Sequence, residues 1–315
     1  MAHKLVHIPH LGHSVCLVPR EQLRFTLHGR RFSPPDHLRG IQTAALPPAI
    51  FNWSKGNLLQ YPMLGNDTKG DCWYAAMCHA VQTWTGNAGV EAVFSAAQVL
   101  ARYAVLSRGD NGLSDAQIIP EWKAGIVGPN GPYKILDEMT VNPTDSVAVA
   151  MAMFYFCGLC YTAALLDQWV ANPRPGDTWD AVGRADPNNG HAMFLTGHNA
   201  SGGYDDETWA FDPPINLTPA GMLASDPELI VAFSLSMFNS AGLTPAGQTY
   251  DQAAALWVQC GGQQLPPSPF GPPAPPVPVP PVPVPPAPPV PTPPAPGVLT
   301  TGTYTVPVGA KLIVL

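Results

Sequence analysis

A run of prolines is the feature that most constrains what this chain can fold into. Nineteen of the 39 prolines lie between Pro266 and Pro296. Proline has no backbone N–H to donate to a helix or a central strand, so this block forms neither. It predicts a polyproline II linker over residues 263–298, which follows a body of about 265 residues and precedes a short strand-like segment at 299–315.

The composition describes a packed body with few charges. Charged residues make up 12% of the chain, about half the usual share, and hydrophobic residues make up 46%. Residues 1–40 carry six Lys or Arg and two acids (+4), whereas residues 41–264 carry eight and twenty (−12). An acidic body excludes a nucleic-acid surface, because phosphate binding needs clustered cations.

Three further observations limit the class of protein. No stretch approaches 18 consecutive apolar residues, so we expect no membrane span. The first residues lack the apolar stretch of a signal peptide, and the spacing of the six cysteines does not suggest a disulfide scaffold. We therefore expect free thiols and a cytoplasmic or virion-associated location. Pro9 and Gly12 interrupt the helix that would align four early histidines, so we expect no metal or cofactor there.

Apolar spacing predicts helices in the first half of the body and strands in the second. Helices are expected from Cys72 to about Trp84 and over 95–107, 115–124 and 144–156. Strands are expected over 158–166, 191–197 and 207–212, and a further strand or helical segment begins at Glu228. Helices followed by strands favour an α+β fold with two lobes.

The segment from Asn66 to Trp73 is the most informative for chemistry. Turn-forming residues precede Cys72, which is expected at the first turn of a helix. The helix dipole there stabilises a thiolate and lowers its pKa, and the first backbone N–H groups have no partner within the helix. This position favours Cys72 as a nucleophile, with helix N–H groups to bind an oxyanion.

A thiolate nucleophile needs a partner for proton transfer, and His191 is the best-placed histidine. It begins a predicted strand directly after Gly190, so its ring can face a cleft. His79 lies seven residues along the helix from Cys72, about 10 Å away, and His198 closes the predicted strand. We therefore expect His191 to be the general base and acid.

Two more residues complete this candidate site. Asp212 ends the strand predicted after His191 and is expected to orient the imidazole, with Asp206 as the alternative. Asn66, six residues before Cys72, offers a side-chain N–H to the oxyanion.

These motifs resemble the papain-like cysteine peptidases. Gly70, Cys72 and Trp73 match the Gly-x-Cys-Trp at the head of the family's central helix, and Asn66 stands where the family has its oxyanion-hole Gln. Residues 190–192 are similar to its Asn-His-Ala strand, and its Asn-Ser-Trp falls at 212–214, where Asp replaces Asn. Further similarities lie at 46–53, 94–98 and 111–126, and the resemblance covers about 46–260. The variant Asn-Asp-x-x-Gly-Asp-Cys is similar to a group of bacterial and phage proteins.

The resemblance implies a papain-like domain over 46–262, with a helical lobe and an antiparallel β lobe. It implies a peptide or protein substrate bound near Gly70, Trp73 and Gly190, and a thiol hydrolase whose nucleophile is Cys72. Residues 1–45 are then expected to be a propeptide or an accessory segment.

Alternatives to an active peptidase follow from the same sequence. A catalytically inactive papain-like module could serve as a structural or phage-particle component, anchored to a partner by the Pro-rich linker and the segment 299–315. The PxxP spacings of the linker lack flanking Lys or Arg, which favours a spacer over a ligand for SH3-like domains. Cys157 and Cys160 match a CxxC pattern but do not begin a helix, so we expect no redox role.

Overall fold

A computed structural model describes residues 3–9, 12–25, 29–39, 46–54, 60–107 and 109–271 of the chain. The chain divides into two units, residues 1–273 and 274–315. The segment predicted at 299–315 and the linker beyond residue 271 lie outside the described residues. Everything below concerns the first unit.

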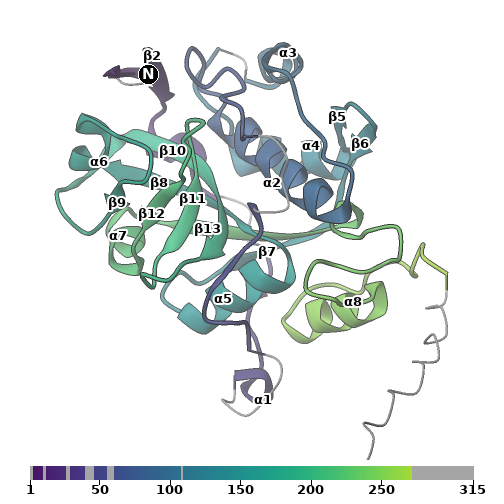
Figure 1. Cartoon of the computed structure of the whole chain (residues 1–315). Helices are drawn as coiled ribbons and strands as arrows, with labels where there is room; N and C mark the ends of the chain where they lie inside the picture. The colour runs from purple at the N-terminus through teal and green to yellow at the C-terminus, as the bar shows by residue number, and fades with distance from the viewer. Residues whose placement is uncertain are drawn as a thin grey trace, which may run out of the picture. The chain divides into compact units, whose positions relative to one another are not determined.

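The helices of this unit differ in length, and a long one lies at the centre. They are α1 (Asp36–Arg39), α2 (Cys72–Ala88), α3 (Ala96–Leu106), α4 (Asp115–Ala124), α5 (Ser146–Tyr155), α6 (Asp167–Ala171), α7 (Pro219–Ala224) and α8 (Tyr250–Gln259), with short 3-10 turns η2 (Arg20–Leu23) and η4 (Leu235–Met237). In Figure 1, α2, α3 and α4 gather on one side and the strands of the large sheet on the other.

Most strands join one mixed sheet of nine. Its order is β3-β7-β13-β8-β10-β11-β12-β9, and β4 pairs with β10 at one side. Their bounds are β3 (Arg31–Phe32), β4 (Phe51–Asn52), β7 (Ile135–Val141), β8 (Leu159–Leu166), β9 (Thr178–Trp179), β10 (Ala185–His198), β11 (Tyr204–Glu207), β12 (Ile215–Leu217) and β13 (Glu228–Ser234). The central pairs are antiparallel, whereas β3 with β7 and β9 with β12 are parallel.

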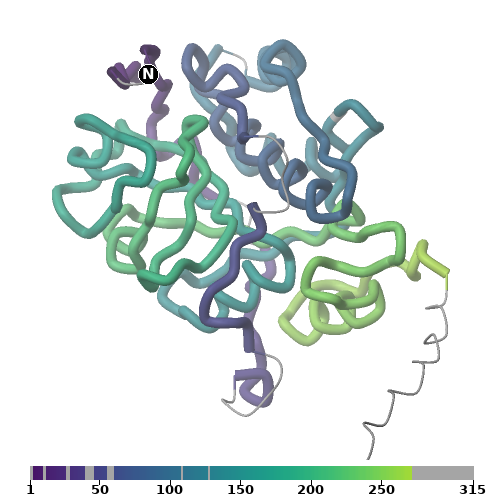
Figure 2. The backbone as a smooth tube through the Cα atoms, viewed as in Figure 1, coloured from purple at the N-terminus to yellow at the C-terminus, as the bar shows by residue number. Residues whose placement is uncertain are grey.

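Two small hairpins lie outside this sheet. One joins β5 (Ile126–Gly128) to β6 (Gly131–Tyr133), and the other joins β1 (Lys4–Ile8) to β2 (His13–Leu17) at the N-terminus. Figure 2 shows the purple N-terminal chain reaching from this hairpin at the top of the view to α1 at the bottom.

The N-terminal region is built into the body. Phe32 of β3 is 1% exposed and pairs with Val141 of the large sheet, and the Ser33 N–H donates to the Cys260 carbonyl. Leu23 and Val15 are also fully buried. Residues 1–45 therefore contribute a strand and core side chains to the same unit as the residues that follow.

Helix α2 is buried in the core of the unit. Every side chain from Cys72 to Thr85 is buried, as expected of a helix that is enclosed on all sides. The helix ends at Gly89, whose φ of 101° is the left-handed conformation that glycine adopts without strain.

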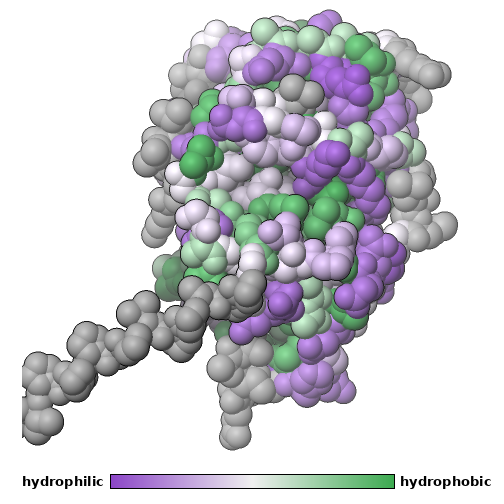
Figure 3. All heavy atoms as spheres, turned by 90° about the vertical axis from the view of Figure 1, so that its right-hand side faces the viewer, coloured by the Kyte–Doolittle hydropathy of each residue, from purple (hydrophilic) through white to green (hydrophobic). Residues whose placement is uncertain are grey.

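On the face shown in Figure 3, hydrophobic residues form small groups between hydrophilic ones. No helix in the described part of the chain is long and apolar enough to cross a membrane.

The predicted α+β fold and most predicted elements are confirmed. Helices α3 and α4 begin after Ser95 and Ser114, which both form capping boxes, and α4 ends at Gly125 as expected. The strand predicted over 207–212 is wrong, because β11 ends at Glu207. Positive φ angles of 51° at Trp209 and 57° at Ala210 turn the chain out of the sheet at that point.

Candidate active site

Cys72 is the first residue of α2, as the sequence predicts. It lines a small enclosed cavity together with residues from the β lobe. The lining residues are Pro62, Met63, Asn66, Cys72, Ala75, Ala76, His79, His191, Ala192, Glu207, Thr208 and Trp209. The cavity has a volume of about 10 Å³, which is about the room of one water molecule. Cys72, His191 and Asn66 therefore share one site, although they lie far apart in the sequence.

The imidazole of His191 is held on one side and unbonded on the other. Its Nε2 lies 2.9 Å from Thr208 Oγ1, and Nδ1 has no hydrogen-bond partner within the described residues. If Nε2 carries the proton, it donates to Thr208 and leaves a lone pair on Nδ1 inside the cavity. The Trp209 ring lies 5.0 Å from the imidazole and shields it from water.

Burial keeps both members of the pair neutral in this arrangement. His191 is 2% exposed, and burial, followed by the nearby His79, lowers its pKa to about 3. Burial raises the pKa of the Cys72 thiol to about 12, against the opposing effect of the Ala192 backbone N–H. The lowered thiol pKa expected from the helix dipole is not observed, because desolvation outweighs the dipole in a closed site.

Asn66 places its side chain near the predicted oxyanion position. It is 2% exposed, and its Nδ2 donates to the Lys69 carbonyl at 3.3 Å and, more weakly, to the Cys16 carbonyl at 3.5 Å. The Cys16 N–H in turn donates to the Asn66 carbonyl at 2.7 Å. The amide that is expected to bind an oxyanion thus already contacts a carbonyl of the N-terminal strand.

The same strand also pairs with the β lobe. Val18 and Gly190 exchange two backbone hydrogen bonds, of 3.0 and 2.7 Å, in an antiparallel bridge. A Cβ at Gly190 would lie 2.5 Å from the Val18 carbonyl oxygen, so only glycine permits this approach. Residues 16–18, which we call the strap, therefore bond to Asn66 on one side and Gly190 on the other.

Two more glycines receive the Val18 side chain. A Cβ at Gly70 would lie 2.6 Å from Val18 Cγ1, and one at Gly112 would lie 3.2 Å from Val18 Cγ2. Gly70 and Gly190, both expected near the substrate, thus contact the strap instead of an open groove.

The two residues considered for orienting the imidazole make no hydrogen bond to it, since its Nε2 contacts Thr208 and its Nδ1 has no partner among the described residues. Asp212 is exposed and follows the turn at Trp209, and its charge acts on Glu207, a residue that lines the cavity. Asp206 is fully buried but is not among the residues that line the cavity, and its pKa is raised well above its ordinary value by burial. Thr208 instead occupies the position next to Nε2.

Trp73 also differs from its expected role. Its side chain is fully buried and its ring lies 6.1 Å from that of Phe25, so it is a core residue and does not line the cavity. His79, dismissed from the helix spacing, does line the cavity, but its Nε2 is bonded to the Pro62 carbonyl at 2.8 Å. Of the two histidines that line the cavity, His191 is the one with a buried nitrogen that lacks a hydrogen-bond partner among the described residues.

Glu207, Thr208 and Trp209 are the cavity residues that sequence reasoning missed. Glu207 is 3% exposed, and burial raises its pKa to about 8, while the Thr196 hydroxyl donates to its Oε1 at 3.2 Å. The available signal was the position of Thr208 and Trp209 directly after a strand. Among the described residues, no group of three or more His, Cys, Asp or Glu side chains is placed to hold a metal ion.

Known proteins resemble this chain in fold but not in sequence. No family model and no curated protein matches the sequence. Among solved structures, the chain is similar to xylellain, a cysteine protease from Xylella fastidiosa, with a TM-score of 0.53 and 14% identity over 69% of this chain and 97% of that one. ProCathepsin B S9 from Trypanosoma congolense has a TM-score of 0.47 and 12% identity, over 69% of this chain and 82% of that one.

The fold assignment depends on xylellain, because the TM-score of the second structure is below 0.5. The described body has the papain-like fold, with a helical lobe and a β lobe, as its sequence motifs predict. At 14% identity, this likeness concerns the fold and not the activity.

Proposed function

We propose that this chain is a cysteine peptidase-like thiol hydrolase. The observation that supports it most is the shared cavity, in which Cys72 at the start of α2 and His191, with Nδ1 unbonded, meet away from solvent. Nucleophile and base then come from different lobes, and a peptide between them can reach both.

The reaction uses these side chains in turn. The Cys72 thiol gives its proton to His191 Nδ1, and Sγ attacks the amide carbonyl carbon. The oxyanion accepts hydrogen bonds from the Cys72 backbone N–H and from Asn66 Nδ2. His191 then protonates the leaving amine as the C–N bond breaks, and water attacks the thioester to release the acid and restore the thiol.

Thr208 takes the orienting role that the sequence assigned to Asp212. Its hydroxyl oxygen accepts the Nε2–H of His191, which holds the tautomer in which Nδ1 is basic. A hydroxyl carries no charge, so it fixes the ring without the electrostatic stabilisation of an imidazolium that a carboxylate provides.

We also propose that the N-terminal region keeps this site closed. The strap bonds to Asn66 and Gly190, the residues expected to hold substrate, and Val18 fills the space beside Gly70. In this proposal residues 46–262 carry the papain-like domain and 1–45 act as its inhibitory segment. Cleavage at residue 46 would also remove β3 from the sheet, so a cut ahead of Arg31 fits the fold better.

The test is hydrolysis of a peptide library, followed by mass spectrometry, in a variant whose strap is displaced by Val18→Asp. We expect cleavage products from this variant and none when Cys72→Ala is added, whereas the buried Cys78→Ala retains activity. Products that persist without Cys72 would move the nucleophile elsewhere. A folded, strap-displaced protein that cleaves nothing and leaves Cys72 unmodified by iodoacetamide would favour an inactive module. The anchoring partner of the Pro-rich linker stays a prediction.

A further inference from the structure

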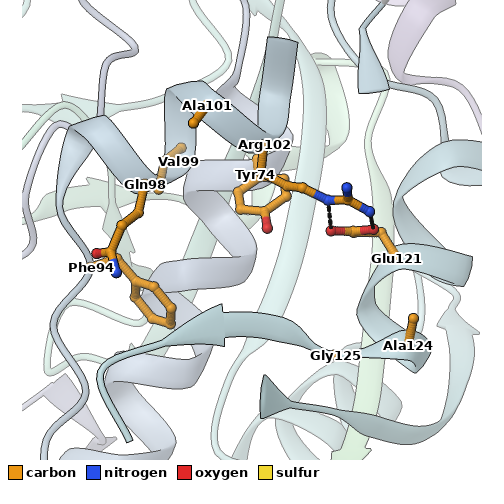
Figure 4. Close-up of a pocket in the computed structure, with 9 residues that line it drawn as sticks. All are labelled: Tyr74, Phe94, Gln98, Val99, Ala101, Arg102, Glu121, Ala124 and Gly125. Atoms are coloured by element: carbon orange, nitrogen blue, oxygen red, sulfur yellow. Dashed lines mark hydrogen bonds and ion pairs between the residues drawn. The ribbon is translucent and has the colours of Figure 1, made fainter. Parts of the chain in front are cut away.

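A second pocket lies on the helical side of the molecule and shares no residue with the Cys72 cavity. It has a volume of about 400 Å³, within the range of about 300–1,000 Å³ that is usual for small-molecule sites. Tyr74 of α2, Phe94, and residues of α3 and α4 form its walls. Figure 4 shows the Tyr74 ring between Phe94 and a pair formed by Arg102 and Glu121.

The aromatic and aliphatic walls are fixed before any ligand binds. Phe94 is 4% exposed and packs edge-on against Tyr133, with ring centroids 5.8 Å apart. Tyr74 is 4% exposed, and Val99 is 1% exposed. A pocket with such walls needs little reorganisation to bind a flat apolar ligand.

The charged groups of the pocket neutralise each other. Arg102 Nε and Nη2 each lie 2.6 Å from a different oxygen of Glu121, in a bidentate ion pair. Each oxygen of the Glu121 carboxylate therefore accepts one hydrogen bond from Arg102. The lining residues therefore carry no net charge and offer a ligand no uncommitted carboxylate.

Hydrogen-bond donors do remain in the pocket. Within the described part of the chain, Arg102 Nη1 and Gln98 Nε2 donate no hydrogen bond, because the Gln98 amide is engaged through its oxygen by Ser95. A ligand that complements this pocket has an apolar ring for Tyr74 and Phe94, an acceptor for these donors, and no charge.

We propose that this pocket binds an uncharged aromatic carbonyl compound, such as an aromatic ester or ketone. The ring lies against Tyr74 and Phe94, and the carbonyl oxygen accepts from Arg102 Nη1 or Gln98 Nε2. A carboxylate is disfavoured by Glu121, and an ammonium group finds only a carboxylate that is already paired.

A ligand-observed NMR titration of the full chain tests this with methyl benzoate, benzoate and benzylammonium. We expect saturable binding of methyl benzoate and at least about tenfold weaker binding of the two ions. Equal binding of benzoate, or no binding of the ester, would overturn the proposal.

Two matched substitutions on α3 locate the site. Ala101 is exposed and lines the pocket, whereas Ala104 is exposed on the same helix outside it. Ala101→Trp fills the pocket and is expected to abolish ester binding, and Ala104→Trp is expected to leave it unchanged. If Ala101→Trp still bound the ester, or if both variants lost binding equally, the ester would bind elsewhere. Either result would refute the proposal that this pocket is the binding site. Gln98→Ala removes one donor and is expected to weaken binding about three- to tenfold.

Discussion

Two cavities touch the first turn of α2, and they differ in almost every respect. The cavity lined by Cys72 and His191, the proposed nucleophile and base, has a volume of about 10 Å³, whereas the pocket at Tyr74 has a volume of about 400 Å³ and contains neither residue. Two residues along a helix correspond to a rotation of about 200°, so the two side chains point to opposite sides. Cavity size therefore does not locate the chemistry here, because the N-terminal strap occupies the bonding groups beside Cys72.

The largest expected effect comes from displacing the strap. Val18 is fully buried, and Val18→Asp places an unpaired carboxylate against Gly70 and Gly112, which costs several kcal/mol. We expect iodoacetamide to modify Cys72 about 100-fold faster in this variant, corresponding to about 3 kcal/mol, while methyl benzoate binding is unchanged.

Leu5→Asp is the control, since Leu5 is 56% exposed on the same N-terminal hairpin. Intact mass and peptide mapping measure both rates, and circular dichroism confirms that the fold is retained. If Leu5→Asp raised the rate of Cys72 modification equally, any added charge would loosen the hairpin, and the strap would not be a specific barrier.

Removing the orienting hydroxyl should have a smaller effect, confined to the Cys72 cavity. Thr208→Val keeps the shape but leaves the buried Nε2–H of His191 without an acceptor, which costs about 1–3 kcal/mol. In the strap-displaced background we expect peptide hydrolysis to fall about tenfold or more. Thr208→Ser should restore it, and Asp212→Ala should have little effect, because Asp212 is exposed and makes no hydrogen bond to His191. A loss with Asp212→Ala instead would return the orienting role to that residue.

Removing a charge from the second pocket should alter only that pocket. Glu121→Gln leaves Arg102 without its carboxylate, so the pocket becomes cationic. We expect benzoate to bind about tenfold more tightly than to the wild type, by NMR titration, with no change at Cys72. If benzoate affinity were the same in Glu121→Gln and the wild type, the ion pair between Arg102 and Glu121 would not determine which ligand charge the pocket prefers.

The most gradual effect is on the pH dependence of stability. The folded-state pKa of Glu207 is raised from 4.5 to about 8, so the folded chain binds more protons than the unfolded one between these values, and stability falls as pH rises through them. His79 and His191 have pKa values lowered from 6.5 to about 4 and about 3, so they remove stability as pH falls below about 6.5.

Urea denaturation of Glu207→Gln between pH 6.5 and 8 isolates the first of these effects. We expect the variant to lose a negative slope that approaches at most about 1.4 kcal/mol per pH unit in the wild type. An unchanged slope would mean that Glu207 is not protonated in the folded chain.

The sequence predicts what depends on local pattern. The position of Cys72 at a helix start follows from the turn residues before it and the apolar spacing after it. The sequence predicts that His191 begins a strand, whereas β10 already begins at Ala185 and His191 lies inside it. The end of the strand before Asp212 is predicted wrongly, because β11 ends at Glu207. The positive φ angles at Trp209 and Ala210, which end it early, belong to residues that rarely adopt them.

The sequence also did not reveal the backbone pairing between segments that are far apart in the chain. The bridge between Val18 and Gly190 joins residues that are 172 positions apart, and neither segment carries a signal for the other. The burial that raises the pKa of the Cys72 thiol likewise involves residues distant in the sequence, because Cys72 shares its cavity with His191 and Trp209. The helix position alone predicts a lowered pKa for the Cys72 thiol. Desolvation raises the pKa instead, and it depends on the residues that cover the sulfur, which the helix position does not reveal.

In the proposed closed state, the strap competes with any substrate that approaches Cys72. Because it belongs to the same chain, its local concentration at the site is set by the tether, on the order of millimolar for short flexible linkers, and does not change on dilution. A free peptide at micromolar concentration therefore competes poorly, however dilute the protein. One cut between Val18 and β3 would turn this intramolecular contact into a bimolecular one, and inhibition would then depend on protein concentration.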